Sequence, residues 1–596
     1  MRIEDYALLG DTQSAALVGR DGSIDWACFP RFDSGACFAK LLGTEDHGRW
    51  KIAPKEPIGE TTRKYRQGTL VLETTMEGRG GAIRLTDCMP IRGRTPDIVR
   101  VVEGLRGEVL VRMELVIRFA YGRIVPWVRS IEGGIRAIAG PDALQLRCDV
   151  ETRGEGLKTV AEFVVREGER RSFVLTWYPS HEEPPAPLDA EQEVRETERF
   201  WCEWSGQCTS QEPWREPIIT SLNVLKALTY APTGGIVAAP TTSLPESPGG
   251  IRNWDYRYCW LRDATLTLYA LLLGGHRAEA EAWRDWLLRA AAGDVSQLQI
   301  LYGVAGERSV EERVLPHLPG YEGARPVRIG NAAANQLQLD VYGEVMDSLY
   351  QACRMGVPAD EWSWSLQQSL LGFLEKAWRE PDNGIWEVRG LPRHFTFSKV
   401  MAWVAFDRGV KTIEQLGRQG PLEKYREIRD AIHEEVCRRG WHPGKRAFTQ
   451  SYDIEELDAS ALLIPTVGFL PASDPRVRDT VAAIERELVQ DGLVLRYRTD
   501  RENVDGLHGR EGAFLACTCW LADAYVLLDR RAEAQALFEH VLSLRNDVGL
   551  LAEEYDPITK RQLGNFPQAF SHLTLVNTAF NLSRTETGPV DHRPQT

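Results

Sequence analysis

The hydrophobic pattern changes its period partway along the chain, and this change constrains the fold most. Up to about residue 185, short segments of alternating apolar and polar residues are separated by turns, as around Asp21-Gly22 in "SAALVGRDGSIDWACFP". A period of two indicates half-buried strands, and Asp-Gly between two strands is a strong hairpin signal. Many strands with little helix predict an antiparallel β-sandwich over residues 1–185.

A charged segment then separates the strands from the rest of the chain. Pro184, Pro185 and Pro187 interrupt the strands, and a charged amphipathic pattern starts near Asp189. Proline cannot donate a backbone hydrogen bond to a sheet, so the sandwich should end here. We expect a linker helix within residues 186–213.

From about Trp214 to residue 585 the period is helical. Twelve apolar-periodic segments occur near residues 215–231, 261–274, 277–291, 335–354, 359–379, 396–415, 421–439, 456–465, 474–489, 511–526, 530–545 and 568–583. Short breaks between neighbours predict antiparallel helix pairs. Periodicity alone does not distinguish a closed (α/α)6 barrel from an open solenoid. The lack of a consensus repeat of about 30–45 residues favours the closed barrel. Residues 586–596 are predicted to be a C-terminal tail.

The composition disfavours several classes of function. The formal net charge of −14 argues against nucleic acid and anionic membranes as partners. The N-terminus "MRIEDYALLGD" lacks a basic region followed by an apolar core, and the eleven cysteines include no CxxC pair. These features predict a cytoplasmic protein with reduced thiols and no metal site. A homo-oligomer is left open.

The first candidate site is the aromatic stretch "NWDYRYCWLRDATL", which includes Tyr256 and Trp260. Arg262 and Asp263 follow and open an apolar helix. Aromatic rings can cover the apolar faces of a sugar, and an Arg-Asp pair can bind its hydroxyls. The structural alternatives are core packing for the rings and a helix cap for Asp263.

The second and third candidates are loop glutamates that precede predicted helices. Glu387 follows Trp386 in "NGIWEVRG", and Glu553-Glu554 lie in "GLLAEEYDP". In a closed barrel such loops can face each other, and glycoside cleavage needs a pair of carboxyl groups. The indole of Trp386 could desolvate Glu387 and favour its protonated form. A solvated surface charge is the structural alternative for each acid.

Other polar loop residues are expected to be structural. They are Asp340, Asp505, His508 and Glu511. Neighbouring residues in an extended loop point in opposite directions, so only one member of Glu553-Glu554 should face the mouth of the barrel.

At these motifs the sequence resembles glycoside hydrolase family 15, the glucoamylases and trehalases, over nearly the whole chain. "YRYCWLRDA" resembles the wall of the first glucose subsite, "GIWEVRG" the general-acid loop and "GLLAEEYDP" the general-base loop. The resemblance implies a β-sandwich, a helical linker and a helical toroid. It also implies inversion at the anomeric carbon and no cofactor. It makes Glu387 the acid and Glu553 the base, with Glu554 as the less favoured alternative for the base.

The subtype signal favours the bacterial and archaeal trehalase-like branch. "IEDYALLGDTQSAALVGRDGSIDWACFPRFDS" is similar to that branch. Val388 stands where glucoamylases often have a second acid, and Tyr555 where they commonly have tryptophan. We therefore expect an exo-acting α-glucosidase that releases β-glucose from trehalose. A glucoamylase-like or isomalto-oligosaccharide α-glucosidase is the alternative. A disaccharide phosphorylase and a non-catalytic sugar-binding protein are alternatives of other classes.

Overall fold

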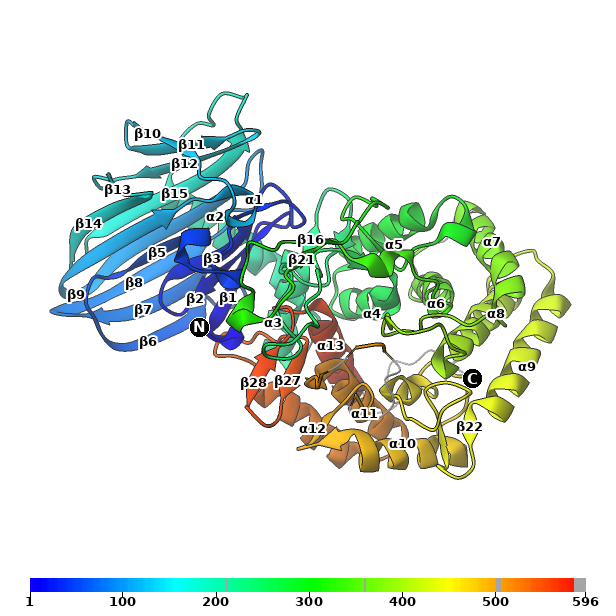
Figure 1. Ribbon diagram of the computed structural model, residues 1–596. Coiled ribbons are helices and arrows are strands. Elements are labelled where there is room, and N and C mark those ends of the chain that lie inside the picture. The colour runs from blue at the N-terminus through cyan, green and yellow to red at the C-terminus, as the bar shows by residue number, and fades with distance from the viewer. Residues whose placement is uncertain (211–212, 359–360, 500–504, 508, 584–596) are drawn as a thin grey trace.

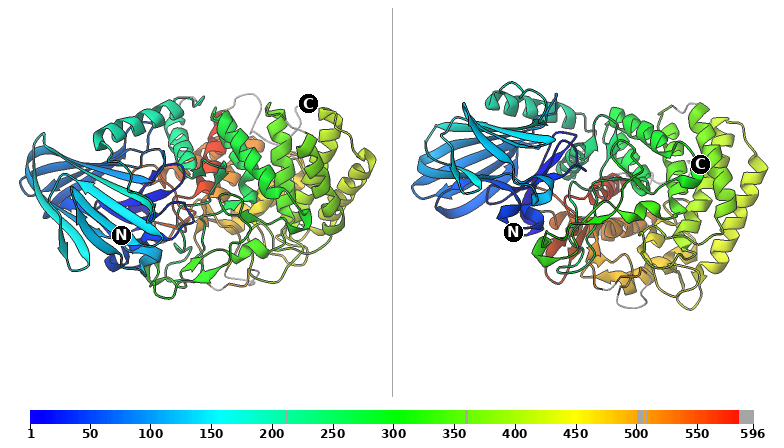
Figure 2. Two further views of the ribbon diagram at one scale, coloured as in Figure 1. Left: turned by 90° about the horizontal axis from the view of Figure 1, so that it is seen from above. Right: turned by 45° about the horizontal axis from the view of Figure 1, so that its top comes forward.

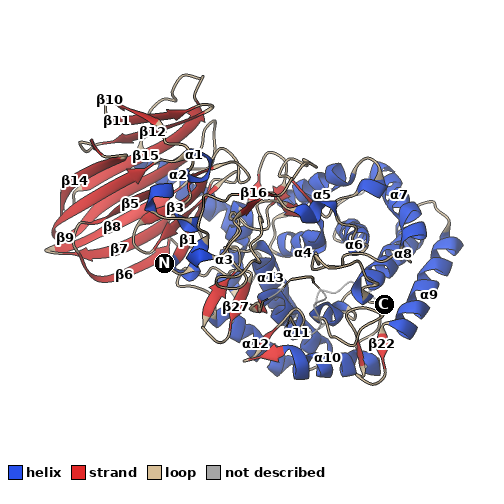
Figure 3. Ribbon diagram, viewed as in Figure 1, coloured by secondary structure: helices blue, strands red, loops and turns tan. Residues whose placement is uncertain are grey.

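The computed structural model describes residues 1–210, 213–358, 361–499, 505–507 and 509–583 (Figure 1). An N-terminal domain of strands lies against one side of a ring of helices, and Figures 2 and 3 show the same arrangement. His508 and the predicted tail at 586–596 lie outside the described residues. Among the described residues, no helix has both the length and the apolar character needed to cross a membrane.

The N-terminal domain is an antiparallel β-sandwich, as predicted, and its two sheets share the long strand β9 (Asp97–Val116). The first half of β9 pairs with β8 and β15, and its second half pairs with β5 and β14. The strand passes from one sheet to the other around Gly104. A Cβ at this residue would lie 2.1 Å from the carbonyl oxygen of Arg166, so only glycine fits there.

The strands follow in spatial order. One sheet contains β1 (Tyr6–Gly10), β2 (Ala15–Gly19), β3 (Ser23–Cys28), β5 (Arg49–Pro54), β9, β14 (Lys158–Arg166) and β13 (Arg153–Glu155), with β4 (Ala36–Phe38) beside β3. The other contains β6 (Pro57–Tyr65), β7 (Leu72–Gly78), β8 (Gly81–Cys88), β9, β15 (Arg170–Pro179), β12 (Asp142–Cys148), β11 (Gly134–Ala139) and β10 (Trp127–Ile131). The short segment α1 (Phe119–Gly122) follows β9.

A single helix, α2 (Ala190–Ser205), connects the sandwich to the ring. The Asp189 side chain accepts hydrogen bonds from the backbone N–H groups of Glu191 and Gln192, both at 3.0 Å. This N-cap explains why the helix begins directly after the proline-rich segment. The predicted domain boundaries at residues 185 and 213 stay predictions.

The helical domain is a closed ring of inner and outer helices, as predicted. The inner elements are α4 (Ala264–Leu273), α6 (Asp340–Arg354), α8 (Thr396–Leu416), the 3-10 helix η8 (Ala459–Leu463), α11 (Leu515–Leu527) and α13 (Ala569–Ser583). Each inner element packs on the next, and α13 packs back on α4. The outer helices are α3 (Arg215–Ala227), α5 (Arg277–Ala291), α7 (Glu361–Ala377), α9 (Leu422–Arg439), α10 (Pro475–Leu488) and α12 (Arg531–Ser543).

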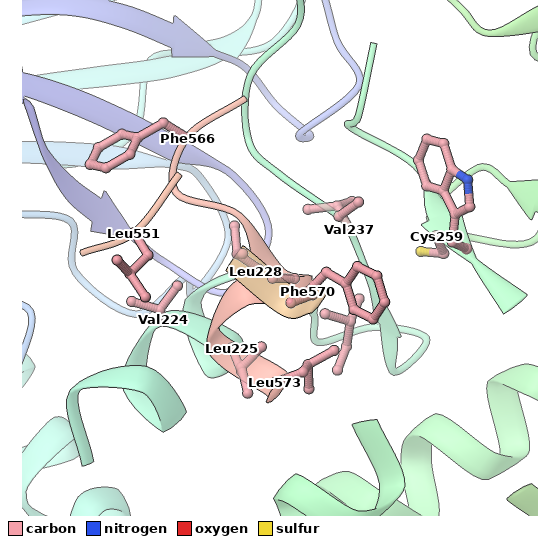
Figure 4. Close-up of a cluster of buried hydrophobic side chains, with 14 of the residues drawn as sticks. Val224, Leu225, Leu228, Val237, Cys259, Leu551, Phe566, Phe570 and Leu573 are labelled. Atoms are coloured by element: carbon pink, nitrogen blue, oxygen red, sulfur yellow. The ribbon is translucent and has the colours of Figure 1, made fainter. Parts of the chain in front are cut away.

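The ring is closed where α3 packs against α13 through apolar side chains. Figure 4 shows Val224 and Leu225 of α3 beside Phe570 and Leu573 of α13, with Leu551 next to them. All of these side chains are buried. Leu551 lies two residues before Glu553, so the same core also anchors the loop that carries the predicted base.

The prediction of an α-helix near residues 456–465 is wrong in type, because the structure has only the short 3-10 helix η8 there. The Asp458 side chain caps its start by accepting a hydrogen bond from the Ser460 N–H at 2.8 Å. Pro465 follows closely and lacks a backbone N–H, so it cannot donate the α-helical hydrogen bond to the carbonyl of Ala461, although Ile464 itself keeps a helical conformation. The apolar pattern is present, but the helix stops after about one turn.

The loops at the mouth of the ring contain two-residue strand pairs and one small sheet. The pairs are β16 (Thr229–Tyr230) with β17 (Gly235–Ile236), β18 (Cys259–Trp260) with β19 (Leu301–Tyr302), β20 (Arg313–Val314) with β21 (Arg328–Ile329), β22 (Trp441–His442) with β23 (Ala447–Phe448), and β24 (Val489–Gln490) with β25 (Leu493–Val494). The small sheet has β26 (Ala513–Phe514), β27 (Glu554–Asp556) and β28 (Arg561–Leu563).

The sandwich is fastened to the loop before α4 by a buried ion pair. Arg257 forms an ion pair with Asp255 at 2.7 Å, and both side chains are almost fully buried. The same guanidinium donates to the backbone oxygen of Ser34 in the sandwich at 3.0 Å. The Trp26 indole of β3 donates to the carbonyl of Pro240 at 2.8 Å. The N-terminal domain therefore supports the aromatic stretch that carries Tyr256 and Trp260.

We expect Arg257→Met to lower the free energy of unfolding by about 3–5 kcal/mol, because it leaves the Asp255 carboxylate buried without its partner. Urea unfolding followed by fluorescence measures this change. Arg277→Met is the control, because Arg277 pairs with Glu281 on the exposed surface, where a pair contributes about 0–1 kcal/mol. Equal effects of the two substitutions would contradict a fastening role for Arg257.

Candidate active site

A pocket lies among the loops that precede inner helices. Its lining comes from residues within 246–260 before α4, 331–333 before α6, 386–389 before α8, and 496–497 with 505–507 before α11. Four segments far apart in the sequence therefore meet at one place. Tyr256, Trp260, Trp386 and Glu387 are among the lining residues.

Glu387 is held from one side of its carboxyl group. Its Oε1 atom accepts hydrogen bonds from the Trp260 indole N–H at 3.0 Å and from Arg262 Nη1 at 2.9 Å. Its backbone has a φ of +50°, a conformation that is strained for a residue other than glycine and typical of functional sites. Burial raises the pKa of Glu387, while the charges of Arg262 and Arg496 and the Trp260 hydrogen bond oppose this shift.

The indole N–H of Trp386 is engaged away from the Glu387 carboxyl group, and desolvation of Glu387 by this ring stays a prediction. Its indole N–H donates to both carboxylate oxygens of Asp458 at 3.0 Å, and its ring packs against Phe514. The indole that contacts the Glu387 carboxyl is that of Trp260. Trp386 therefore forms a wall of the pocket and fixes the loop that bears Glu387.

Glu553 is buried, with 2% of its surface exposed. Its Oε1 atom accepts a hydrogen bond from the Tyr256 hydroxyl at 2.8 Å. Its Oε2 atom has no hydrogen-bond partner among the described residues. A Cβ at Gly564 would lie 2.7 Å from Oε2, so glycine leaves this oxygen its space.

The charge environment makes Glu553 a stronger base than an exposed glutamate. Its pKa is raised well above the ordinary value, first by burial and then by the negative charge of Glu246. Arg496, the Tyr256 hydrogen bond and Arg262 act in the opposite direction. A carboxylate with a raised pKa accepts a proton more readily once it is ionised.

The two glutamates are connected through two aromatic rings. The rings of Tyr256 and Trp260 pack edge to face, with their centroids 5.2 Å apart. Tyr256 donates to Glu553, and Trp260 donates to Glu387. The aromatic stretch therefore holds both predicted acids at one pocket, although Glu553 lies behind Tyr256 and is not itself part of the lining.

Glu554 points away from Glu553, as expected for neighbours in an extended segment. Its Oε2 atom accepts a hydrogen bond from the Gly512 N–H at 2.9 Å, and its Oε1 atom lies 3.5 Å from Arg496. The Glu554 carboxylate thus binds the backbone just before β26 and belongs to the ion-pair cluster around Arg496. This geometry favours Glu553 over Glu554 as the group that faces Tyr256.

Arg262 and Asp263 lie just behind the pocket lining. Arg262 Nε donates to Asp263 at 2.9 Å, and Nη1 donates to the carbonyl of Ile385 at 3.3 Å as well as to Glu387. Asp263 stands at the N-cap position of α4 but makes no capping hydrogen bond with its side chain. The helix-cap alternative is therefore wrong, and the pair is directed at the Glu387 loop.

Three charged residues of the pocket, Glu246, Arg252 and Arg496, were not singled out by sequence reasoning. Arg496 pairs with Glu246 at 3.0 Å and also with Glu511. Arg252 pairs with Asp505 at 2.7 Å, and Asp505, which was expected to be structural, lines the pocket. Glu246 and Arg252 come shortly before the aromatic stretch, and this closeness was the available signal. Nothing in the sequence around Arg496 indicated that its loop reaches the site.

Asp340 fits the structural interpretation, since it is buried at the start of α6 and is not part of the pocket lining. Neither of its carboxylate oxygens has a partner among the described residues. Burial and the nearby charge of Asp382 raise the pKa of Asp340 to about 8. Burial thus favours the protonated form of this carboxyl group.

One group of carboxylates has the spacing of a metal site, but an arginine already occupies it. Oxygens of Glu246, Glu511 and Glu554 lie within 4.8 Å of one another. The guanidinium of Arg496 contacts all three. Its positive charge stands where a metal ion would, so the donor set does not fit a bound cation.

Comparison with known proteins agrees with this arrangement. Residues 213–580 match the Glycosyl hydrolases family 15, and residues 1–201 match the domain described as "Trehalase-like, N-terminal". The trehalase of Mycobacterium tuberculosis is 39% identical over 98% of this chain and 90% of its own length. That of Mycolicibacterium smegmatis is 38% identical over 98% and 92%.

Among solved structures, a bacterial glucoamylase complexed with acarbose superposes with a TM-score of 0.75 at 12% identity, covering 98% of this chain and 94% of that one. This likeness concerns the fold, a β-sandwich joined to an (α/α)6 barrel. The family match spans more than half of the chain, and the two trehalases align along almost all of it. The chain therefore belongs to glycosyl hydrolases family 15 and is a glycoside hydrolase.

Proposed function

We propose that this protein hydrolyses trehalose with inversion, releasing β-glucose, with Glu387 as general acid and Glu553 as general base. The observation that carries the proposal is the pair of buried carboxyl groups, each with one oxygen engaged by an aromatic donor. In each case the second oxygen is left for chemistry. Such a pair is the requirement for glycoside hydrolysis.

Glu387 is suited to donate a proton. Trp260 and Arg262 both contact Oε1, which leaves Oε2 to carry the proton toward the glycosidic oxygen. Because burial raises its pKa, the group retains its proton at a higher pH than an exposed glutamate does. Protonation of the leaving oxygen then assists cleavage of the bond to the anomeric carbon.

Glu553 is suited to activate water. Tyr256 fixes Oε1, and the unpartnered Oε2 is the acceptor for a proton of the attacking water. The hydroxide equivalent attacks the anomeric carbon on the face opposite the leaving oxygen, so the α-linkage gives β-glucose. Tyr256, Trp260 and Trp386 supply aromatic walls for the ring of the first glucose, and Arg262 and Asp263 support these walls from behind.

Trehalose is favoured over starch by the relatives and by the pocket. The two mycobacterial relatives carry the name trehalase over nearly the full length of this chain. Val388, an apolar residue, lines the pocket directly after the acid, where many glucoamylases have a second acidic residue. The buried base argues against the phosphorylase alternative, because phosphate needs no carboxylate to activate it. The presence of both acids argues against a binding protein.

Substitution of either acid tests the assignment. Glu387→Gln and Glu553→Gln should each lower kcat on trehalose by about 10²–10⁴-fold while the fold is kept, because each removes one proton transfer. Glu279→Gln is the matched control, because this partly buried glutamate pairs with Lys226 away from the pocket. Near-normal turnover by both site variants would refute the pair. An inactive Glu554→Gln beside an active Glu553→Gln would move the base by one residue.

The stereochemistry of the product is a second test. Proton NMR of the first minutes of trehalose hydrolysis should show β-glucose and α-glucose in a 1:1 ratio before mutarotation, because the attacked glucose is inverted and the leaving glucose keeps its α configuration. A retaining enzyme would release only α-glucose at first. An inverting pair needs a carboxyl separation of about 6.5–9.5 Å, which leaves room for the water. Early α-glucose alone would contradict the mechanism.

The pH dependence tests the contact between Trp260 and Glu387. The indole N–H stabilises the charged form of Glu387, so Trp260→Phe should raise the pKa of the acid further. A general acid must be protonated, and activity is lost as the pH rises through its pKa. The basic limb of kcat/KM should therefore move to higher pH. Trp386→Phe is the control, since its N–H serves Asp458, and it should leave this limb in place. A limb that stays put or moves down in Trp260→Phe would contradict the contact.

A further inference from the structure

The pocket lining includes a second group of polar residues that the mechanism does not use. Besides Trp260 and Glu387, the pocket is lined by Arg252, Tyr497 and Asp505, which we call its second end. The charged groups of the second end come from two loops that precede different inner helices, α4 and α11. A disaccharide has two sugar rings, and the proposed mechanism assigns binding residues only to the first.

The second end is built around the carboxylate of Asp505. Its Oδ2 atom accepts hydrogen bonds from Arg252 at 2.7 Å and from the Tyr497 hydroxyl at 2.9 Å. Its Oδ1 atom accepts one from the Leu507 N–H at 2.9 Å. The side chains of Arg252 and Asp505 are 2% and 5% exposed. The Nε atom of Arg252 is buried and has no partner among the described residues.

This end is fixed to the loop of the proposed acid. The Arg389 N–H donates to the carbonyl of Asp505 at 2.9 Å, and Arg389 follows Glu387 by two residues. A Cβ at Gly506 would lie 2.9 Å from the backbone nitrogen of Gly390, so the two loops are in close contact. The position of Asp505 is therefore set relative to Glu387.

The position of the acid tells which ring this end would face. A general acid protonates the oxygen between the two sugars, so it stands at the junction of the two rings. The base acts on the first ring, and Glu553 is held at the Tyr256 side. Groups that are fixed to the acid loop, as Asp505 is, then lie near the junction where the departing sugar begins.

We propose that Arg252 and Asp505 bind the hydroxyls of the leaving glucose and so determine which leaving groups are accepted. The inference rests on the proposed function and adds residues for the second sugar. The pair has no net charge and offers both donors and an acceptor, which suits neutral hydroxyls. A site built to hydrogen-bond hydroxyls discriminates strongly against a leaving group that lacks them.

Two substrates with the same glucose but different leaving groups test the proposal. The leaving group of trehalose is glucose. The leaving group of α-glucosyl fluoride is fluoride, so this substrate has no second ring to bind. Asp505→Asn should lower kcat/KM for trehalose at least about 10-fold and change that for the fluoride less than about 3-fold. Arg252→Lys should act in the same direction, because lysine lacks the planar fork of arginine.

A structural role predicts a different result. If the pair only fastens the two loops, both substrates will lose activity by the same factor, and the proposal is overturned. Asp347→Asn is the matched control, because Asp347 forms a buried pair with Arg408 in the same barrel at 2.7 Å. Any effect of this control should be equal for the two substrates. Unchanged trehalose kinetics in Asp505→Asn would also overturn the proposal.

If the Asp505 and Arg252 variants fail to fold, Tyr497→Phe is used instead, because it removes one hydrogen bond to Asp505 and keeps the aromatic ring. This variant should lose activity on trehalose more than on the fluoride, by a smaller factor than Asp505→Asn. An equal loss on both substrates would refute the proposal. Should the wild-type protein release no glucose from trehalose, the proposed substrate is wrong. The loss of kcat/KM in each variant is then compared between α-glucosyl fluoride and the α-glucosyl disaccharide that the protein does cleave.

Discussion

Two carboxyl groups, those of Glu387 and Glu553, are buried near one pocket, and the surrounding structure depends on how their charges are compensated. An isolated buried carboxylate is unstable and takes up a proton. Here each glutamate receives one hydrogen bond from an aromatic residue, and arginines stand nearby at distances that differ between the two. Arg262 touches Glu387 directly. Arg496 is instead surrounded by Glu246, Glu511 and Glu554, so it tempers Glu553 without forming an ion pair with it.

The sequence was sufficient for the architecture because periodicity is a property of each segment by itself. The change from a period of two to a helical period separated the sandwich from the barrel, and the positions of Glu387 and Glu553 followed from their place before helices. The 456–465 segment shows the limit of this reasoning. Its apolar spacing is helical, but one aspartate and one proline decide how long the helix lasts.

The site was harder to predict because its contacts join loops that are far apart in the chain. Sequence reasoning assigned Arg262 to the sugar and did not indicate its ion pair with Glu387. It likewise did not indicate that the indole N–H that reaches the Glu387 carboxyl is that of Trp260. Arg252 and Asp505 form a hydrogen bond although they are 253 residues apart in the sequence, and no local pattern indicates such a partner. Only the geometry of the closed ring brings these side chains together.

The closed ring also has a consequence for the order in which the protein is made. The first inner helix, α4, has the last one, α13, as its neighbour, and the loop with Glu553 is among the last segments to be synthesised. Domains tend to fold from the N-terminus while the chain is still growing. The sandwich can form early, but α4 must wait with an apolar side uncovered until nearly the whole chain has left the ribosome. The helix that completes the barrel arrives together with the proposed base, so an interrupted chain lacks both.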